Sequence, residues 1–124
     1  MDNEVKLTKD DSIFFMDMVG SRKSPNHVPK INKVKPYRKM LKDRNSTEYT
    51  RFIRIYKAMR HILSEREMII LDEIYGVNGV NCTLKTTGEK VNLSPERVRQ
   101  ICKKSENKLV FGILKKLKED ANKS

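Results

Sequence analysis

Five polar side chains near the C-terminal third of the chain have the chemistry needed to read the edges of DNA base pairs. Gln can bind adenine through two hydrogen bonds, Glu can accept from cytosine, and Arg or Lys can bind guanine or phosphate. On a helix these residues would share one outer face. They are Glu96, Arg99, Gln100, Lys103 and Lys104. A polar helix that is simply exposed to water is the alternative reading.

The same segment has the features of a helix start and of an apolar face. Ser94 fits the N-cap, and Pro95 fits the first helical position, where an amide would have no partner. Glu96 adds a negative charge to the first turn, where the helix dipole favours it. The side chains expected to face inward are Val98, Ile101, Cys102, Ser105 and Leu109.

The residues before this helix match the requirements of a helix-turn-helix. Gly88 supplies the small residue needed where the two helices touch. Four residues later the turn needs a backbone that tolerates positive φ, which Asn92 does less freely than glycine. Six residues further on, Val98 supplies the aliphatic wedge between the helices. Three more residues complete the small core: Val91, Leu93 and Ile101. The agreement of these offsets favours DNA reading over a solvated helix.

Two amphipathic helices are expected upstream, and each is recognised by apolar residues at steps of three and four. Ser64 and Glu67 have the form of a capping box, so the second helix starts at residue 64 or 65 and stops at Gly76. Thr83 is a plausible cap for a third helix that runs to about Val91. The inward residues of the first helix are expected to be Tyr49, Phe52, Ile53, Tyr56, Met59, Ile62 and Leu63, and those of the second Met68, Ile69, Leu71, Ile74 and Tyr75.

The first of these helices also carries a basic side. It consists of Arg51, Arg54, Lys57 and Arg60. We expect this side to be solvated, with contact to DNA or to a polymerase as the alternative.

Two stretches together resemble region 4 of sigma-70-type factors: LSEREMIILDEIYGVNG and TLKTTGEKVNLSPERVRQICKKSENKL. The resemblance covers residues 47–110, and its most specific part runs from Leu93 to Ile101. It implies that this helix enters the major groove of a −35-type promoter element. It also implies that an apolar face of the earlier helices holds the flap of the RNA polymerase β subunit.

The resemblance implies particular roles for the candidate DNA-binding residues. Base contacts would come from Glu96 and Gln100, and phosphate contacts from Arg97, Arg99 and Lys104. The complete set of expected DNA-binding residues is Ser94, Glu96, Arg97, Arg99, Gln100, Lys103 and Lys104.

Three features depart from that family. Pro95 stands where the family often has an Arg that reads guanine, so the recognised sequence should differ from the usual −35 element. Thr86 and Thr87 replace acidic and aliphatic residues before Gly88, which weakens the first helix slightly. No segment matches region 2, and we therefore expect a stand-alone region-4-like regulator rather than a complete sigma factor.

The charge of the chain is concentrated before the region-4-like segment. The net charge is +11, and residues 20–62 hold thirteen Lys and Arg against two acids. Such a block commonly binds phosphate through counterion release, and a solvated linker is the alternative. Three prolines, Pro25, Pro29 and Pro36, predict an extended linker over residues 20–45 that turns helical near Tyr37–Leu41.

Both termini carry apolar residues of undecided role. Residues 1–11 are polar and expected to fray, and Ser12 could cap a short helix that Gly20 ends. The apolar run 12–19 is expected to pack on the protein's own core, with a docking peptide as the alternative. At the other end, Val110, Ile113, Leu114 and Leu117 are expected to pack on the domain, with a dimer or polymerase contact as the alternative.

Composition argues against catalysis and against a membrane protein. The 124 residues include no nucleophile–base pair, no phosphate-binding glycine loop and no metal-ligand spacing around Cys82 or Cys102. We expect no enzyme activity and no cofactor, and we read Cys102 as a small buried thiol. No apolar stretch approaches membrane-spanning length and the N-terminus does not resemble a signal peptide, so a cytoplasmic, nucleoid-associated protein of bacterial or phage type is expected.

These observations predict an all-α protein with two parts. Residues 1–45 would be an N-terminal extension, and residues 46–120 a sigma region 4-like helix-turn-helix domain. The predicted function is sequence-specific binding of double-stranded DNA at promoters together with RNA polymerase. The alternative is an interaction module that binds the polymerase flap or another transcription factor with only incidental DNA contact. The oligomeric state stays open.

Overall fold

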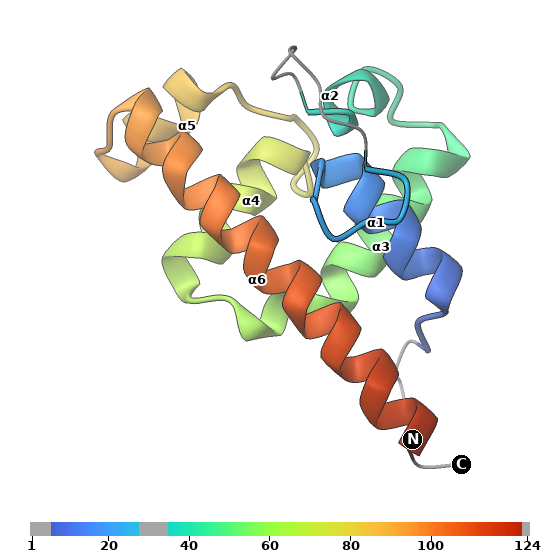
Figure 1. The fold of residues 1–124 in the computed structure, drawn as a ribbon. Helices are drawn as coiled ribbons and strands as arrows, with labels where there is room; N and C mark the ends of the chain where they lie inside the picture. The colour runs from blue at the N-terminus through green and yellow to red at the C-terminus, as the bar shows by residue number, and fades with distance from the viewer. Residues whose placement is uncertain (1–5, 28–34, 123–124) are drawn as a thin grey trace, which may run out of the picture.

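The computed structural model describes residues 6–27 and 35–122, and the regular structure within them is entirely helical (Figure 1). The predicted all-α class is therefore confirmed. The elements are α1 (Lys9–Val19), α2 (Tyr37–Met40), α3 (Thr47–Met59), the 3₁₀ helix η1 (Arg60–Ile62), α4 (Glu65–Tyr75), α5 (Leu84–Val91) and α6 (Pro95–Asn122). No helix in these ranges is long and apolar enough to cross a membrane.

Helix α6 runs diagonally across the whole molecule and organises the other helices (Figure 1). Its 28 residues span about 42 Å at 1.5 Å per residue. Helices α4 and α5 pack against it toward its N-terminal end, and α1, α3 and η1 also pack on it. Val110 and Ile113 are each only 1% exposed. The prediction that the C-terminal stretch packs on the domain is therefore confirmed.

Helix α1 starts earlier than the sequence suggested. Thr8, not Ser12, is the N-cap, and it forms a capping box with Asp11. The fraying expected up to residue 11 is wrong for the described residues, because Leu7 is buried and Asp11 is 4% exposed. Gly20 ends the helix in the left-handed region with φ 70°, as predicted.

The apolar run of α1 lies in the core, which confirms the expected packing. Phe15 is fully buried and stacks on Phe52 of α3, with ring centroids 5.1 Å apart. Phe52 in turn meets the edge of Tyr75 at 4.8 Å. The aromatic core therefore joins α1, α3 and α4.

The described part of the basic linker also belongs to this core. Helix α2 forms where a helical turn was expected, and Tyr37, Met40 and Leu41 are all buried. The helical turn expected near Tyr37–Leu41 is thus confirmed, and it packs in the core, while Pro29 lies outside the described residues. Residues on both sides of the expected boundary at residue 45 share one core.

The local start and stop signals of α4 and α5 are confirmed. Ser64 and Glu67 form the predicted capping box, and Gly76 ends α4 at φ 73°. Thr83 caps α5 through the amide of Thr86, and α5 ends at Val91.

The inward faces of α3, η1 and α4 differ from the prediction at four isoleucines, of which Ile55 of α3 is fully buried although it was not expected to face inward. Ile69 is 42% exposed, and Ile62 is 40% exposed. Ile70 is fully buried instead of its neighbour Ile69. Residues 68–71 are all apolar, so periodicity alone did not fix which of them faces inward. The other residues predicted to face inward are buried or half-buried.

Candidate nucleic-acid interface

The two helices α5 and α6 meet at a tight turn whose backbone determines their angle. Asn92 adopts φ 60° and ψ 44°, the left-handed conformation predicted for the turn. A Cβ at Gly88 would lie 2.3 Å from the carbonyl oxygen of Leu93, so only glycine allows this approach. Val98 is fully buried, and its Cγ2 lies 3.4 Å from the same Cβ position. The predicted helix-turn-helix is therefore confirmed.

The start of α6 also forms as the residue types indicated. Helix α6 begins at Pro95, and the Ser94 hydroxyl accepts a hydrogen bond from the Arg97 amide at 3.1 Å. The five residues expected to face inward are all buried: Val98, Ile101, Cys102, Ser105 and Leu109. Burial, together with the nearby charge of Glu106, raises the pKa of the Cys102 thiol to about 12, so this thiol is an inert part of the core.

The six candidate side chains on the first turns of α6 are all exposed. They are Glu96, Arg97, Arg99, Gln100, Lys103 and Lys104. Because the helix is continuous through them, the structure brings these residues together on one side of the molecule. Ser94 lies at the same end, with its hydroxyl used as the cap.

Several of these exposed groups are paired with one another. Arg99 Nε lies 2.9 Å from both carboxylate oxygens of Glu96, and Arg99 Nη2 lies 2.5 Å from Glu96 Oε1. The hydrogen bonds from Arg99 lower the pKa of Glu96. Arg97 donates to Gln100 Oε1 at 3.3 Å. Pairs this exposed are weak in water, so their members can exchange partners when another polar surface approaches.

Comparison with known protein families gives a match for this segment. Residues 61–109 match the family described as sigma-70, region 4. The match covers less than half of the 124-residue chain. No curated protein and no solved structure gave a match. The family is one of helix-turn-helix DNA-binding regulatory domains and is not an enzyme family.

The region 4 match covers only part of the folded unit. It includes α4, α5 and the first half of α6, whereas α1, α2 and α3 lie outside it. The resemblance seen in the sequence began earlier, at residue 47. The shared core nevertheless joins the matched segment to the preceding helices through contacts such as that of Phe52 with Tyr75.

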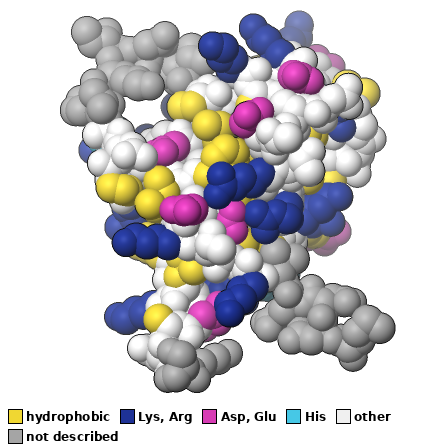
Figure 2. Space-filling model, turned by 90° about the vertical axis from the view of Figure 1, so that its right-hand side faces the viewer, with side chains coloured by type: hydrophobic (Ala, Val, Ile, Leu, Met, Phe, Trp, Pro, Cys, Tyr) yellow, Lys and Arg dark blue, Asp and Glu magenta, His cyan; other side chains and the backbone are white. Residues whose placement is uncertain are grey.

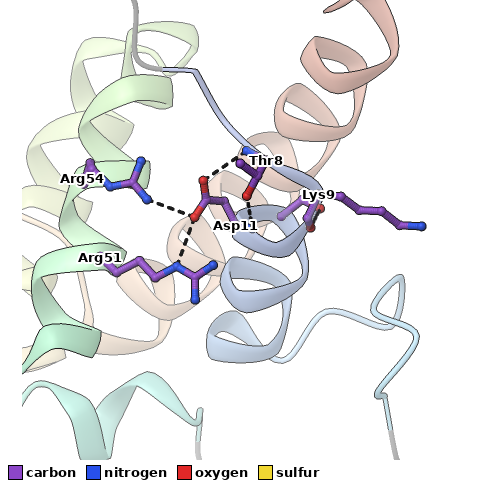
Figure 3. A network of polar contacts seen from close by, with 6 residues as sticks. Thr8, Lys9, Asp11, Arg51 and Arg54 are labelled. Atoms are coloured by element: carbon purple, nitrogen blue, oxygen red, sulfur yellow. Dashed lines mark hydrogen bonds and ion pairs between the residues drawn. The ribbon is translucent and has the colours of Figure 1, made fainter. Parts of the chain in front are cut away.

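The basic side of α3 is largely engaged within the protein, which the sequence did not predict. Asp11 of α1 accepts from Arg51 Nε and from Arg54, each at 3.0 Å (Figure 3). Arg60 binds Asp72 of α4 at 3.0 Å. The face that shows α1 and α3 therefore mixes dark-blue cations with carboxylates and apolar side chains (Figure 2). These contacts disfavour DNA binding by this side of α3.

A buried carboxylate on α6, Glu106, joins the matched segment to the N-terminal part of the chain. Glu106 is 1% exposed and accepts a hydrogen bond from the Tyr75 hydroxyl at 2.5 Å. Lys35 Nζ lies 3.4 Å from its other oxygen and donates to the Val19 carbonyl at 2.9 Å. Burial raises the pKa of Glu106 despite the Lys35 charge. Sequence reasoning missed this residue because a Glu between Ser105 and Asn107, in a lysine-rich stretch, resembles a solvated position.

Proposed function

We propose that this protein is a sequence-specific transcription regulator that binds promoter DNA through α5 and α6 and acts with RNA polymerase in the bacterial cytoplasm, at the nucleoid. The observation that carries the proposal is the exposed polar side of α6, held at a fixed angle by the Gly88–Leu93 contact. A rigid helix-turn-helix presents such a side to the major groove. The match of residues 61–109 to sigma-70 region 4 supports this arrangement.

Each exposed side chain has a role suited to its chemistry. Gln100 would bind adenine through two hydrogen bonds, and Glu96 would accept from the amino group of cytosine. The cations would bind phosphate oxygens beside the groove, and the Ser94 cap would hold the first turn at the DNA backbone. These cations are Arg97, Arg99, Lys103 and Lys104.

The pairs seen on α6 must open when DNA binds. Glu96 cannot accept freely from cytosine while both of its carboxylate oxygens are hydrogen-bonded to Arg99. Gln100 must likewise lose its hydrogen bond from Arg97 before it can bind adenine. Both Glu96 and Arg99 are more than half exposed, so the exchange is not costly. Because the Pro95 side chain has no hydrogen-bond donor with which to read guanine, we expect a preferred sequence different from the usual −35 element.

The deciding experiment selects bound duplexes from a random pool, with and without RNA polymerase. The Gln100→Ala variant should then bind the selected duplex about 5- to 140-fold more weakly, since one good bidentate base contact contributes about 1–3 kcal/mol. Asn122→Ala removes an exposed amide from the far end of α6 and should leave affinity unchanged. Equal affinity of Gln100→Ala and the parent protein would rule out base reading by this helix.

A second candidate function rests on the unexpected exposure of Ile62 and Ile69. In this case the domain binds the polymerase β flap or another transcription factor through an apolar surface, and DNA contact is incidental. The test is capture of the protein by RNA polymerase. This function is favoured if capture survives high salt and is lost in Ile69→Ser, and if the protein shifts no duplex. Loss of capture in Gln100→Ala but not in Ile69→Ser would favour the first.

A further inference from the structure

Helix α2 and the residues around it form a compact basic segment outside the region 4 match. Residues 35–45 hold five cations and one acid. Two of the cations are used internally: Lys35 binds Glu106, and Arg44 lies over the Tyr49 ring at 5.0 Å. The other three are exposed: Arg38, Lys39 and Lys42. None of the three forms an ion pair with a carboxylate in the described ranges.

The segment is held in place by its apolar side. Tyr37 is 3% exposed and meets the edge of Tyr75 at 5.3 Å, and Met40 is also buried. These contacts hold the apolar side of α2 against the core, so its cations must face outward. The three charges therefore sit on a fixed support rather than on a free tail.

Helix α2 borders the part of α6 that follows the DNA-reading turns. Its neighbour Lys35 contacts Glu106, and the charge of Arg38 acts on Cys102. On a helix, Arg99 and Lys103 precede Glu106 by seven and three residues, so they lie on the same side of α6 as Glu106. In Figure 1, α2 and α5 both lie at the upper end of the molecule, away from the C-terminus. The segment that carries the α2 cations therefore borders the side of α6 on which Arg99 and Lys103 lie.

We propose that Arg38, Lys39 and Lys42 bind the phosphate backbone that flanks the groove entered by α6. The inference rests on the proposed DNA binding and adds a second contact region outside the helix-turn-helix. Helix α2 has only four residues and its apolar side is buried, so it cannot enter a groove itself. Arg and Lys presented at a surface bind phosphate regardless of sequence and release condensed counterions.

The test compares two triple variants that remove the same charge. The first is Arg38→Gln with Lys39→Gln and Lys42→Gln. The control replaces three exposed lysines far from α2 by Gln, namely Lys57, Lys115 and Lys118. Binding of the selected duplex and of a random duplex is measured at several salt concentrations, and thermal unfolding checks that each variant is folded.

The α2 variant should lower the steepness of the log-affinity against log-salt plot by about 0.9 for each lost phosphate contact. It should weaken the selected and the random duplex equally, and the control should change the slope little. Equal slopes for the two variants, or loss of polymerase binding with DNA binding intact, would overturn the proposal. If the α2 variant unfolds, the double variant Lys39→Gln with Lys42→Gln replaces it, and its log-affinity against log-salt slope is compared with that of the control. A parent protein that binds no duplex would instead disprove the proposed function.

Discussion

Two arginine–carboxylate clusters in this protein use similar groups in different environments. In the first, the 4% exposed carboxylate of Asp11 joins α1 to two arginines of α3. In the second, Glu96 and Arg99 pair within one helix, and their side chains are 57% and 54% exposed. The first cluster fixes α1 against α3, which are far apart in the sequence. The second is easily opened, which is what a surface that must bind DNA requires.

The comparison shows that burial, not residue type, separates structural from functional charge in this chain. Arg51 and Arg99 have the same side chain, and the sequence pattern was compatible with DNA contact by both of them. Desolvation makes it costly to separate Arg51 from a buried partner, whereas water readily replaces the partner of Arg99. The following predictions test this difference, from the largest expected effect to the smallest.

The largest effect is expected when the α1–α3 contact loses its aromatic centre. Phe15→Ala removes a fully buried ring that stacks on Phe52, so the free energy of unfolding should fall by about 3–4 kcal/mol. Urea unfolding followed by circular dichroism measures this loss. A loss below about 1 kcal/mol would show that α1 is not part of the cooperative core.

A smaller loss is expected at the contact between α5 and α6. In Gly88→Ala the new Cβ would meet the Leu93 carbonyl, which is backbone and cannot move aside, so stability should fall by about 2 kcal/mol. DNA affinity should fall as well because the angle between the helices must change. Gly112→Ala is the matched control, since its Cβ would meet the flexible end of Ile62. Equal losses in the two variants would contradict a rigid turn.

The Asp11 cluster should contribute about 2 kcal/mol, because Asp11→Ala removes a capping box and charged hydrogen bonds together. Burial alone would raise the pKa of Asp11, but the Thr8 amide and the two arginines outweigh it and lower the pKa below 3.8. The contribution of Asp11 is therefore present above about pH 4 and is lost as the pH falls through the lowered pKa of the folded protein. Parent and variant should converge in stability toward acid pH. A constant difference down to pH 2 would argue against the charged contacts.

The smallest effect on stability is expected at the Glu96–Arg99 pair. Glu96→Gln should leave the unfolding midpoint unchanged, because both groups are exposed. It should instead change the base preferred at one position of the selected duplex, since an amide can donate as well as accept. Parallel thermal unfolding and duplex selection measure the two outcomes. A lowered midpoint without a change of preference would reverse the roles assigned to the two clusters.

Local signals in the sequence determined much of the fold and of the candidate interface. The caps at Ser64, Thr83 and Ser94 and the turn at Asn92 involve groups only a few residues apart, so residue type and spacing suffice to predict them. The exposed side of α6 followed from the same local pattern. The match of residues 61–109 to region 4 agrees with that reading.

Only the tertiary structure decided which polar residues are buried and which charges are engaged. Asp11 meets Arg51 across 40 residues of sequence, and Tyr75 meets Glu106 across 31. No periodic pattern encodes such contacts, because each charged residue taken alone looks suited to water. Their partners become known only when α1 and α2 pack against α3, α4 and α6, since it is this packing that removes water and fixes the charges in pairs.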